Sequence, residues 1–133
     1  GKTVAKQSIK YELFNYLYKA FSELGVTVVR VVDQYTELGY PFIAIEEIQD
    51  LVSVQSFDNY GGEPKARIHL WSDADDLQKH DELYLQIQQI LMKTEQLPSY
   101  HVSLVNINTN DINDDTTNTH LQHSIIDSEF QTL

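Results

Sequence analysis

The chain has 133 residues, no cysteine, and a formal net charge of -11 that arises from 20 acidic and 9 basic side chains. This length fits one domain with its own core, and the lack of cysteine excludes disulfides, thiolate metal sites and a cysteine nucleophile. The lack of cysteine also leads us to expect a protein that folds inside the cell. No apolar run approaches the roughly 20 residues of a membrane span, and the N-terminus lacks the layout of a secretory signal. The charge argues against generic binding to nucleic-acid backbone, because such affinity comes from lysine and arginine.

The first part of the chain predicts a helix followed by a strand. Apolar residues recur at three- and four-residue spacing over residues 6–24, which is typical of an amphipathic helix. Gly25 stands where a C-cap glycine belongs. The β-branched run over residues 26–32 then predicts a strand, because such side chains pack well on a pleated surface.

Two weaker signals precede the middle of the chain. A second strand is predicted over 42–47, where the preceding Pro41 costs no ladder hydrogen bond. Residues 51–57 alternate weakly and indicate an edge strand or an extended arm. The segment 58–64 is rich in turn-forming residues, so we expect a mobile loop at about 50–64.

The most informative segment covers residues 65–73, where side chains of two kinds alternate. Three apolar residues fall on one face of the predicted strand and three others on the opposite face: Ala66, Ile68 and Leu70, then Arg67, His69 and Trp71. We expect the apolar face to contact the helices. The other face is a candidate for contact with another protein, since tryptophan and arginine are enriched at interfaces. For Trp71 we also expect packing against the start of the next helix.

That next helix is predicted to begin near residue 75, because Ser72 and Asp75 have the spacing of a capping box. Its expected buried stripe consists of Leu83, Ile87, Ile90, Leu91 and Leu97. Pro98 is expected to mark its end.

Two strands are predicted at 101–107 and 121–130, separated by an acidic, asparagine-rich stretch at about 108–119 that we expect to be a mobile loop. The order of elements is helix, strands, helix, strands. This order predicts a single α+β domain over residues 1–133, with a mainly antiparallel β-sheet and two helices packed on one face.

The five histidines do not indicate a metal site. His120 and His123 are three residues apart on a predicted strand, which places them on opposite faces, and no carboxylate stands at a zinc-enzyme spacing. We interpret the histidines as ordinary surface or rim residues. A calcium loop counted from Asp111 fails, because Thr116 replaces the required glycine and Gln122 the required glutamate.

Other catalytic patterns fail as well. Glu46 and Glu47 are adjacent on a predicted strand, face opposite ways, and make a poor acid–base pair. The sequence has neither a phosphate-binding glycine loop nor a nucleophile elbow. We therefore predict no catalytic residue, no cofactor, no metal and no enzymatic activity.

Short motifs spread over nearly the whole chain carry a family resemblance. They are Tyr40-Pro41-Phe42-Ile43-Ala44-Ile45, then Ile68-His69-Leu70-Trp71-Ser72 opening a helix with a leucine-rich end, then an aspartate-bearing loop and a last strand after His120. In these features the chain resembles the tail-completion or tail-terminator family of long-tailed bacteriophages, which joins heads to tails. Its long acidic loop before His120 departs from a typical member.

The resemblance implies a structural protein without enzymatic activity. Such subunits form a homo-oligomeric ring, usually a hexamer, that caps the tail tube and joins it to the head connector. The implied partners are further copies of the chain, the major tail tube protein and a head-completion protein, with no membrane. The implied location is the neck or tail of the virion, after assembly in the host cytoplasm.

For this ring we expect a subunit or partner interface at Arg67, His69, Trp71, Asp58 and Tyr60, and channel or loop contacts at Asp111, Asp114 and Asp115. An acidic inner wall would let DNA pass through without specific binding, because like charges lower the affinity for phosphates. Two alternatives stay open. One is a small acidic binding module, such as a DNA mimic that inhibits a nucleic-acid enzyme; the other is a small hydrolase with a pocket lined by His69 and carboxylates.

Overall fold

The computed structural model describes residues 6–34, 37–52, 62–114 and 120–133. In chain order its elements are α1 (Ile9–Ser22), β1 (Thr27–Arg30), the 3₁₀ turn η1 (Val31–Asp33), β2 (Phe42–Ile45), β3 (Gln49–Leu51), β4 (Glu63–Asp73), α2 (Leu77–Met92), β5 (Val102–Asp114) and β6 (Leu121–Thr132). Within the described residues no helix is long and apolar enough to cross a bilayer.

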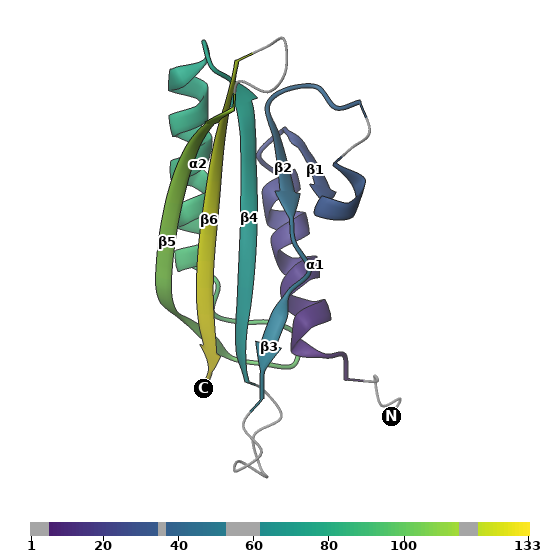
Figure 1. Ribbon diagram of the computed structural model, residues 1–133. Helices are drawn as coiled ribbons and strands as arrows, with labels where there is room; N and C mark the ends of the chain where they lie inside the picture. The colour runs from purple at the N-terminus through teal and green to yellow at the C-terminus, as the bar shows by residue number, and fades with distance from the viewer. Residues whose placement is uncertain (1–5, 35–36, 53–61, 115–119) are drawn as a thin grey trace.

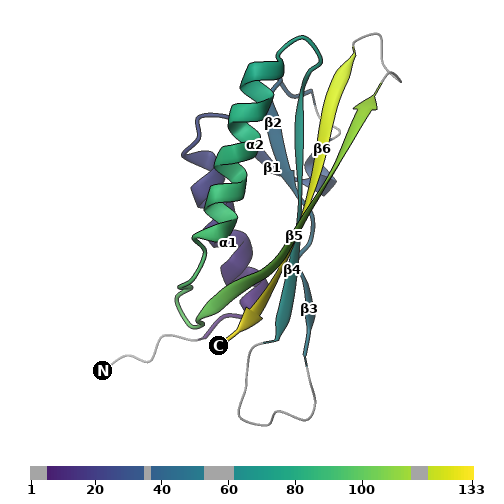
Figure 2. The ribbon, with the colours of Figure 1, turned by 90° about the vertical axis from the view of Figure 1, so that its left-hand side faces the viewer.

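The strands form one six-stranded sheet in the order β1-β2-β4-β6-β5, and β3 pairs with the first residues of β4 (Figure 1). β1 and β2 are parallel, whereas every other pairing is antiparallel. Both helices lie on the same side of this sheet, as Figure 2 shows. The predicted α+β architecture, with two helices on one face of a mainly antiparallel sheet, is confirmed.

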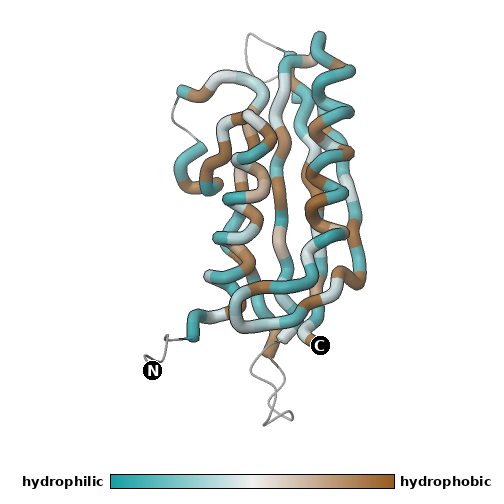
Figure 3. The backbone as a smooth tube through the Cα atoms, turned by 180° about the vertical axis from the view of Figure 1, so that it is seen from behind, coloured by the Kyte–Doolittle hydropathy of each residue, from teal (hydrophilic) through white to brown (hydrophobic). Residues whose placement is uncertain are grey.

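The core fills the space between the helices and the sheet. Seen from the helix side, hydrophobic and hydrophilic segments alternate along both helices (Figure 3). The largest fully buried side chains are Phe21, Phe130, Leu13, Leu17, Ile43, Ile45, Ile48, Ile68, Leu70, Leu83, Ile87 and Leu91. Each contributes about 1.5–3 kcal/mol through removal of apolar surface from water, and together they fix the covered face of the sheet.

Capping side chains set the position of α1. The Ser8 side chain accepts a hydrogen bond from the backbone N–H of Tyr11 at 3.2 Å, so the helix begins at Ile9 rather than at residue 6. At the other end Gly25 has a φ of 81°, which confirms the expected left-handed glycine. Glu12 is buried and accepts from the backbone N–H of Ser99 at 2.7 Å, which ties α1 to the connection between α2 and β5.

The strands predicted at 26–32, 42–47 and 51–57 are shorter in the structure. β1 stops at Arg30 because its parallel ladder ends at the pairing of Arg30 with Ile45, where β2 ends too. The chain then turns into η1 although Val31 and Val32 are β-branched, because strand propensity alone does not maintain a strand without a pairing partner. β3 covers only Gln49–Leu51, and residues 53–57 lie outside the described part of the chain.

The predicted capping box is wrong. Ser72 lies inside β4, where it is buried and its hydroxyl binds a side chain of α2. The helix begins only at Leu77, after Asp76 in the N-cap position, whose side chain makes no capping hydrogen bond. α2 also ends earlier than expected, at Met92, and Leu97 is buried from the connection that follows.

The loop predicted at about 108–119 is wrong over its first half. Residues 108–114 continue β5, paired in register with β6 as far as Asp114 and Leu121. Polar side chains are tolerated there because β5 is an edge strand whose side chains are mostly exposed. The two ends of the loop predicted at 50–64 likewise belong to β3 and β4. Residues 53–61 and 115–119 lie outside the described part of the chain.

Candidate functional site

The face of the sheet turned away from the helices, here called the open face, carries a set of polar and aromatic side chains. They come from the two central strands: Lys65, Arg67, His69 and Trp71 of β4, and His123, Asp127 and Glu129 of β6. The alternation predicted for β4 is confirmed, because Ala66, Ile68 and Leu70 are buried on the covered face while Arg67 is exposed. The register places Trp71 opposite His123 and Arg67 opposite Asp127.

Four rings form a row across one end of the open face. The Tyr40 and Phe42 rings lie 5.6 Å apart, those of Phe42 and Trp71 lie 6.2 Å apart, and Trp71 stacks on His123 at 3.7 Å with 12° between the ring planes. The expected packing of Trp71 against the start of α2 is therefore wrong. An odd-numbered residue of β4 faces away from the helices, so its neighbours come from β2 and β6.

A hydrogen-bonded chain runs from Glu46 through His69 to His123. The Nε2 atom of His69 lies 2.6 Å from Oε2 of Glu46, and its Nδ1 atom lies 2.7 Å from Nε2 of His123. A carboxylate only accepts, so His69 donates from Nε2 to Glu46. Both ring nitrogens of His69 are thus occupied by protein groups, which leaves this imidazole no free lone pair for the proton of a substrate.

Ion pairs flank this chain. Arg67 donates from Nε to Oδ1 of Asp127 at 2.6 Å and from Nη2 to Oδ2 at 3.3 Å, and its Nε lies 3.7 Å from Oε2 of Glu46. Asp127 raises the pKa of Arg67. Lys65 and Glu129 pair at 3.5 Å. Pairs this exposed contribute only about 0.2–1 kcal/mol each, so they order the surface more than they stabilise the fold.

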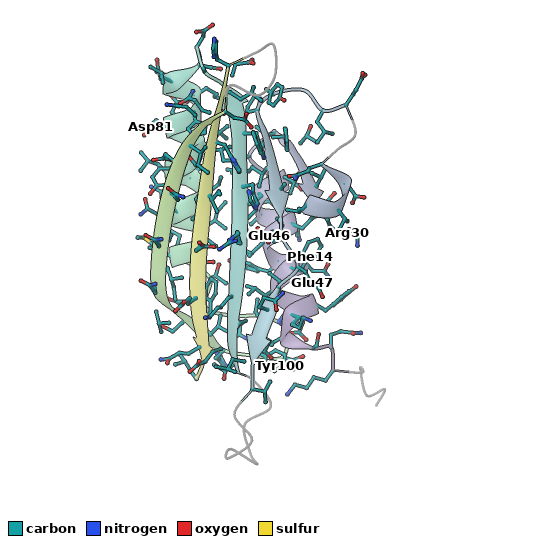
Figure 4. All side chains as sticks on the ribbon, viewed as in Figure 1. Phe14, Arg30, Glu46, Glu47, Asp81 and Tyr100 are labelled. Carbon is teal, nitrogen blue, oxygen red and sulfur yellow. The ribbon has the colours of Figure 1, made fainter. Side chains whose placement is uncertain are left out.

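Glu46 and Glu47 serve opposite sides of the sheet, as their adjacency predicted. Figure 4 shows both where β2 passes into β3. Glu46 contacts His69 and Arg67 on the open face, while the carboxylate of Glu47 lies 3.6 Å from Nζ of Lys10 on α1. Neither glutamate has the other as a partner for acid–base chemistry.

A second histidine network lies on the covered face. His80 of α2 is buried between two serine hydroxyls, with Nδ1 2.7 Å from Ser72 Oγ and Nε2 2.8 Å from Ser124 Oγ. Ser124 donates its single proton to Asp111, so His80 donates from Nε2 and accepts from Ser72 at Nδ1. Burial lowers the pKa of His80. The carboxylate here orients a serine rather than the histidine, unlike the order Ser-His-Asp of a hydrolase triad.

The expectation of ordinary rim histidines is therefore wrong for three of the five. His80 is buried, and His69 and His123 are partly buried and bonded to each other. Among the described residues no group of three or more His, Cys, Asp or Glu side chains is arranged to hold a metal ion. A shallow pocket of about 430 Å³ opens on the open face between Glu46, Arg67, Asn108 and Asp127.

The predicted interface residues separate into two groups. Arg67, His69 and Trp71 lie together on the open face. Asp58, Tyr60 and the predicted channel residue Asp115 lie outside the described part of the chain.

The other two predicted channel residues belong to strand β5, not to a loop. Asp111 is exposed and accepts from Ser124 on the covered face, and Asp114 is the last residue of β5. Sequence reasoning missed Glu46, His123 and Asp127. The signal was the alternation of polar residues in the last strand, which needed the pairing of β6 with β4 to be interpreted.

No protein-family model matches the sequence, and no curated protein matches it either. Among the solved structures that match, two share the fold over nearly their whole length. One superposes with a TM-score of 0.62 at 11% identity, and the match covers 94% of this chain and 93% of that chain. The other belongs to the virion of a native gene transfer agent (GTA) particle, with a TM-score of 0.58, 8% identity, and coverage of 93% of this chain and 95% of that chain. At such identities the likeness establishes the fold alone.

Proposed function

We propose that the chain is a structural protein of a phage-like virion, which forms a ring that caps the tail tube and joins the tail to the head connector. The observation that carries this proposal is the fold match with a chain of a GTA virion particle, since it extends over 95% of that chain. The motifs that resemble tail-terminator proteins support the same function, and in this proposal the protein has no enzymatic activity.

The proposed subunit contact uses the open face. Arg67, His69 and Trp71 are held in fixed positions by their neighbours on β2 and β6, so little side-chain entropy is lost when a partner covers them. A head-to-tail ring contact pairs two different patches, one from each neighbouring subunit. The open face is the first patch, and the ring, in our proposal a hexamer, closes on another surface of the next copy.

The proposed channel contact uses the acidic end of the molecule. Asp73, Asp75 and Asp76 are exposed where β4 passes into α2, and Asp114 ends β5 at the same end of the sheet (Figure 1). Phosphates of a passing genome are repelled by such a surface, so DNA moves through the ring without being held. The tail tube protein and the head-completion protein are the proposed partners on the two sides of the ring.

The alternative of a DNA mimic gains no support from the open face. A mimic presents carboxylates that are free to meet a basic groove. Here the carboxylates of Glu46, Asp127 and Glu129 each lie within 4 Å of a basic side chain of the chain itself, at distances of 2.6 to 3.7 Å. We therefore keep the ring as the proposed function.

The test mixes the purified chain with polymerising tail tube protein and follows tube length and end structure by electron microscopy. We expect tubes that stop growing and carry a ring at one end. An Asn108→Arg variant places a long charged side chain on the open face and is expected to prevent ring closure. The matched control, Gln86→Arg, makes the same change of charge at an exposed position of α2 and is expected to cap normally. A chain that stays monomeric at high concentration and leaves tube growth unchanged contradicts the proposal.

A further inference from the structure

The contact between His69 and His123 has a specific proton requirement. Their facing nitrogens, Nδ1 and Nε2, are 2.7 Å apart, and this distance needs one hydrogen between them. In the neutral pair His69 donates to Glu46 from Nε2, so the hydrogen between the rings belongs to His123. The contact joins β4 to β6, and Glu46 extends it to the segment between β2 and β3.

The pair can take up one proton and keep this contact. A proton added to Nδ1 of His69 makes an imidazolium that faces Glu46 on one side and donates to His123 on the other, while the hydrogen of His123 moves to its own Nδ1. A second proton changes the outcome. Both facing nitrogens then carry hydrogens, two like charges stand in contact, and the hydrogen bond is lost.

The groups around the pair come from the β2–β3 connection, β4, β5, β6 and α2. Glu46 faces His69 from the β2–β3 connection. Arg67, which lies on β4 like His69, forms ion pairs with Glu46 and Asp127. His123 stacks on Trp71, and its charged or titratable neighbours are His69, Asp114 of β5 and His80 of α2. Of these groups, Asp114 favours a positive charge on His123, whereas burial and both histidines oppose it.

We propose that Glu46, His69 and His123 form a pH switch that orders the open face, closed while one hydrogen lies between the two imidazoles and open when both are fully protonated. When it opens, β6 loses a side-chain link to β4 and Glu46 loses its indirect link to β6. This inference concerns the free subunit and does not depend on the proposed ring.

The expected pH of opening follows from the same surroundings. Burial, and then the neighbouring His69, lower the pKa of His123 from 6.5 to about 4. The switch therefore stays closed at neutral pH and through the first protonation, and it opens in acid near pH 4.

Trp71 gives the experiment a local signal, because it is the only tryptophan of the chain and stacks on His123. A protonated imidazole in contact with an indole ring quenches its fluorescence, so Trp71 emission reports the charge of His123. We would titrate the folded chain from pH 8 to pH 3 and record this emission together with the imidazole ¹⁵N signals in NMR. We expect one transition of His123 near pH 4 that both signals share, and a change of its neutral tautomer when His69 gains a proton.

A variant and its control distinguish the effect of His69 on the pKa of His123 from the effect of burial alone. His69→Gln removes the charged neighbour but keeps hydrogen-bonding groups, so the midpoint of His123 should rise toward 6.5 by about half a unit or more. His101→Gln, at an exposed position, should leave it unchanged. A His123 midpoint near 6.5 in the unmodified chain overturns the proposal, and so does a His123 midpoint that His69→Gln does not move. The first of these outcomes needs no variant.

Discussion

The two faces of the sheet are built by the same strands but are held by different forces. On the covered face, Ile68, Leu70 and Ile126 are completely buried against the helices, and dispersion and the hydrophobic effect hold them. On the open face, neighbouring residues of the same strands are held by ring stacking, a histidine pair and ion pairs. Because successive side chains of a strand alternate, β4 and β6 can specify the fold with one face and a contact surface with the other.

The largest expected difference between the faces lies within β4 itself. Leu70→Ala leaves a cavity in the core and should lower the free energy of unfolding by about 2–5 kcal/mol. Arg67→Ala, three residues earlier on the open face, removes exposed ion pairs and should cost about 1 kcal/mol or less. Urea denaturation measures both values. Equal losses would mean that the open face supports the fold as strongly as the core does.

The aromatic row is expected to be the most stabilising part of the open face. Trp71→Ala removes stacking with Phe42 and His123 and should lower the free energy of unfolding by about 2 kcal/mol. Trp71→Phe is the control. The indole Nε1 is buried and has no hydrogen-bond partner among the described residues, so replacing the indole by a phenyl ring loses no hydrogen bond there and should cost less than about 1 kcal/mol. A large loss for both variants would mean that the indole, and not an aromatic ring of any kind, provides the stability.

The buried polar network around His80 on the covered face offers a third comparison. His80→Leu fills a similar volume but leaves the hydroxyl of Ser72 without its side-chain partner, so we expect a loss of about 1–2 kcal/mol. The exposed His101→Leu should change stability by less than about 0.5 kcal/mol. If His80→Leu is neutral in thermal unfolding, the network orders the covered face without stabilising it.

The last comparison concerns the pH dependence of stability from the histidines of both faces. The pKa values of His80 and His123 are lowered on folding, the latter from 6.5 to about 4, so the unfolded chain binds more protons between these values. Stability is therefore full above about pH 6.5 and falls as the pH drops through about 4. His123→Gln should flatten this slope in denaturation curves collected from pH 7 to pH 4. An unchanged slope would assign the acid sensitivity to carboxylates.

The covered face could be predicted from the sequence because its signals are local. Alternation alone predicts the buried side of β4, with Ala66, Ile68 and Leu70. The helical period predicts the buried side of α1 in the same way. The polar residues 108–114 gave no such signal. They form a strand only because the long β6 offers them a ladder, which is tertiary information.

Only part of the open face could be predicted from the sequence. The sequence placed Arg67, His69 and Trp71 on one side of a strand, yet it did not give their partners. His69 and His123 are 54 residues apart in the chain, and Glu46 lies just beyond the end of β2. A shift of the β4–β6 register by one residue would turn His123 to the covered face, so only the observed pairing brings the histidines together.

The proposal that the open face closes a ring is tested most directly by a cryo-electron microscopy reconstruction of the chain bound to the end of its tail tube. The account predicts a closed ring at the tube end in which Arg67, His69 and Trp71 are covered by the neighbouring subunit and Asp73, Asp75 and Asp76 face the channel. A tube end without a ring, or a ring whose subunits meet through α1 and α2 while the open face stays in solvent, would contradict it.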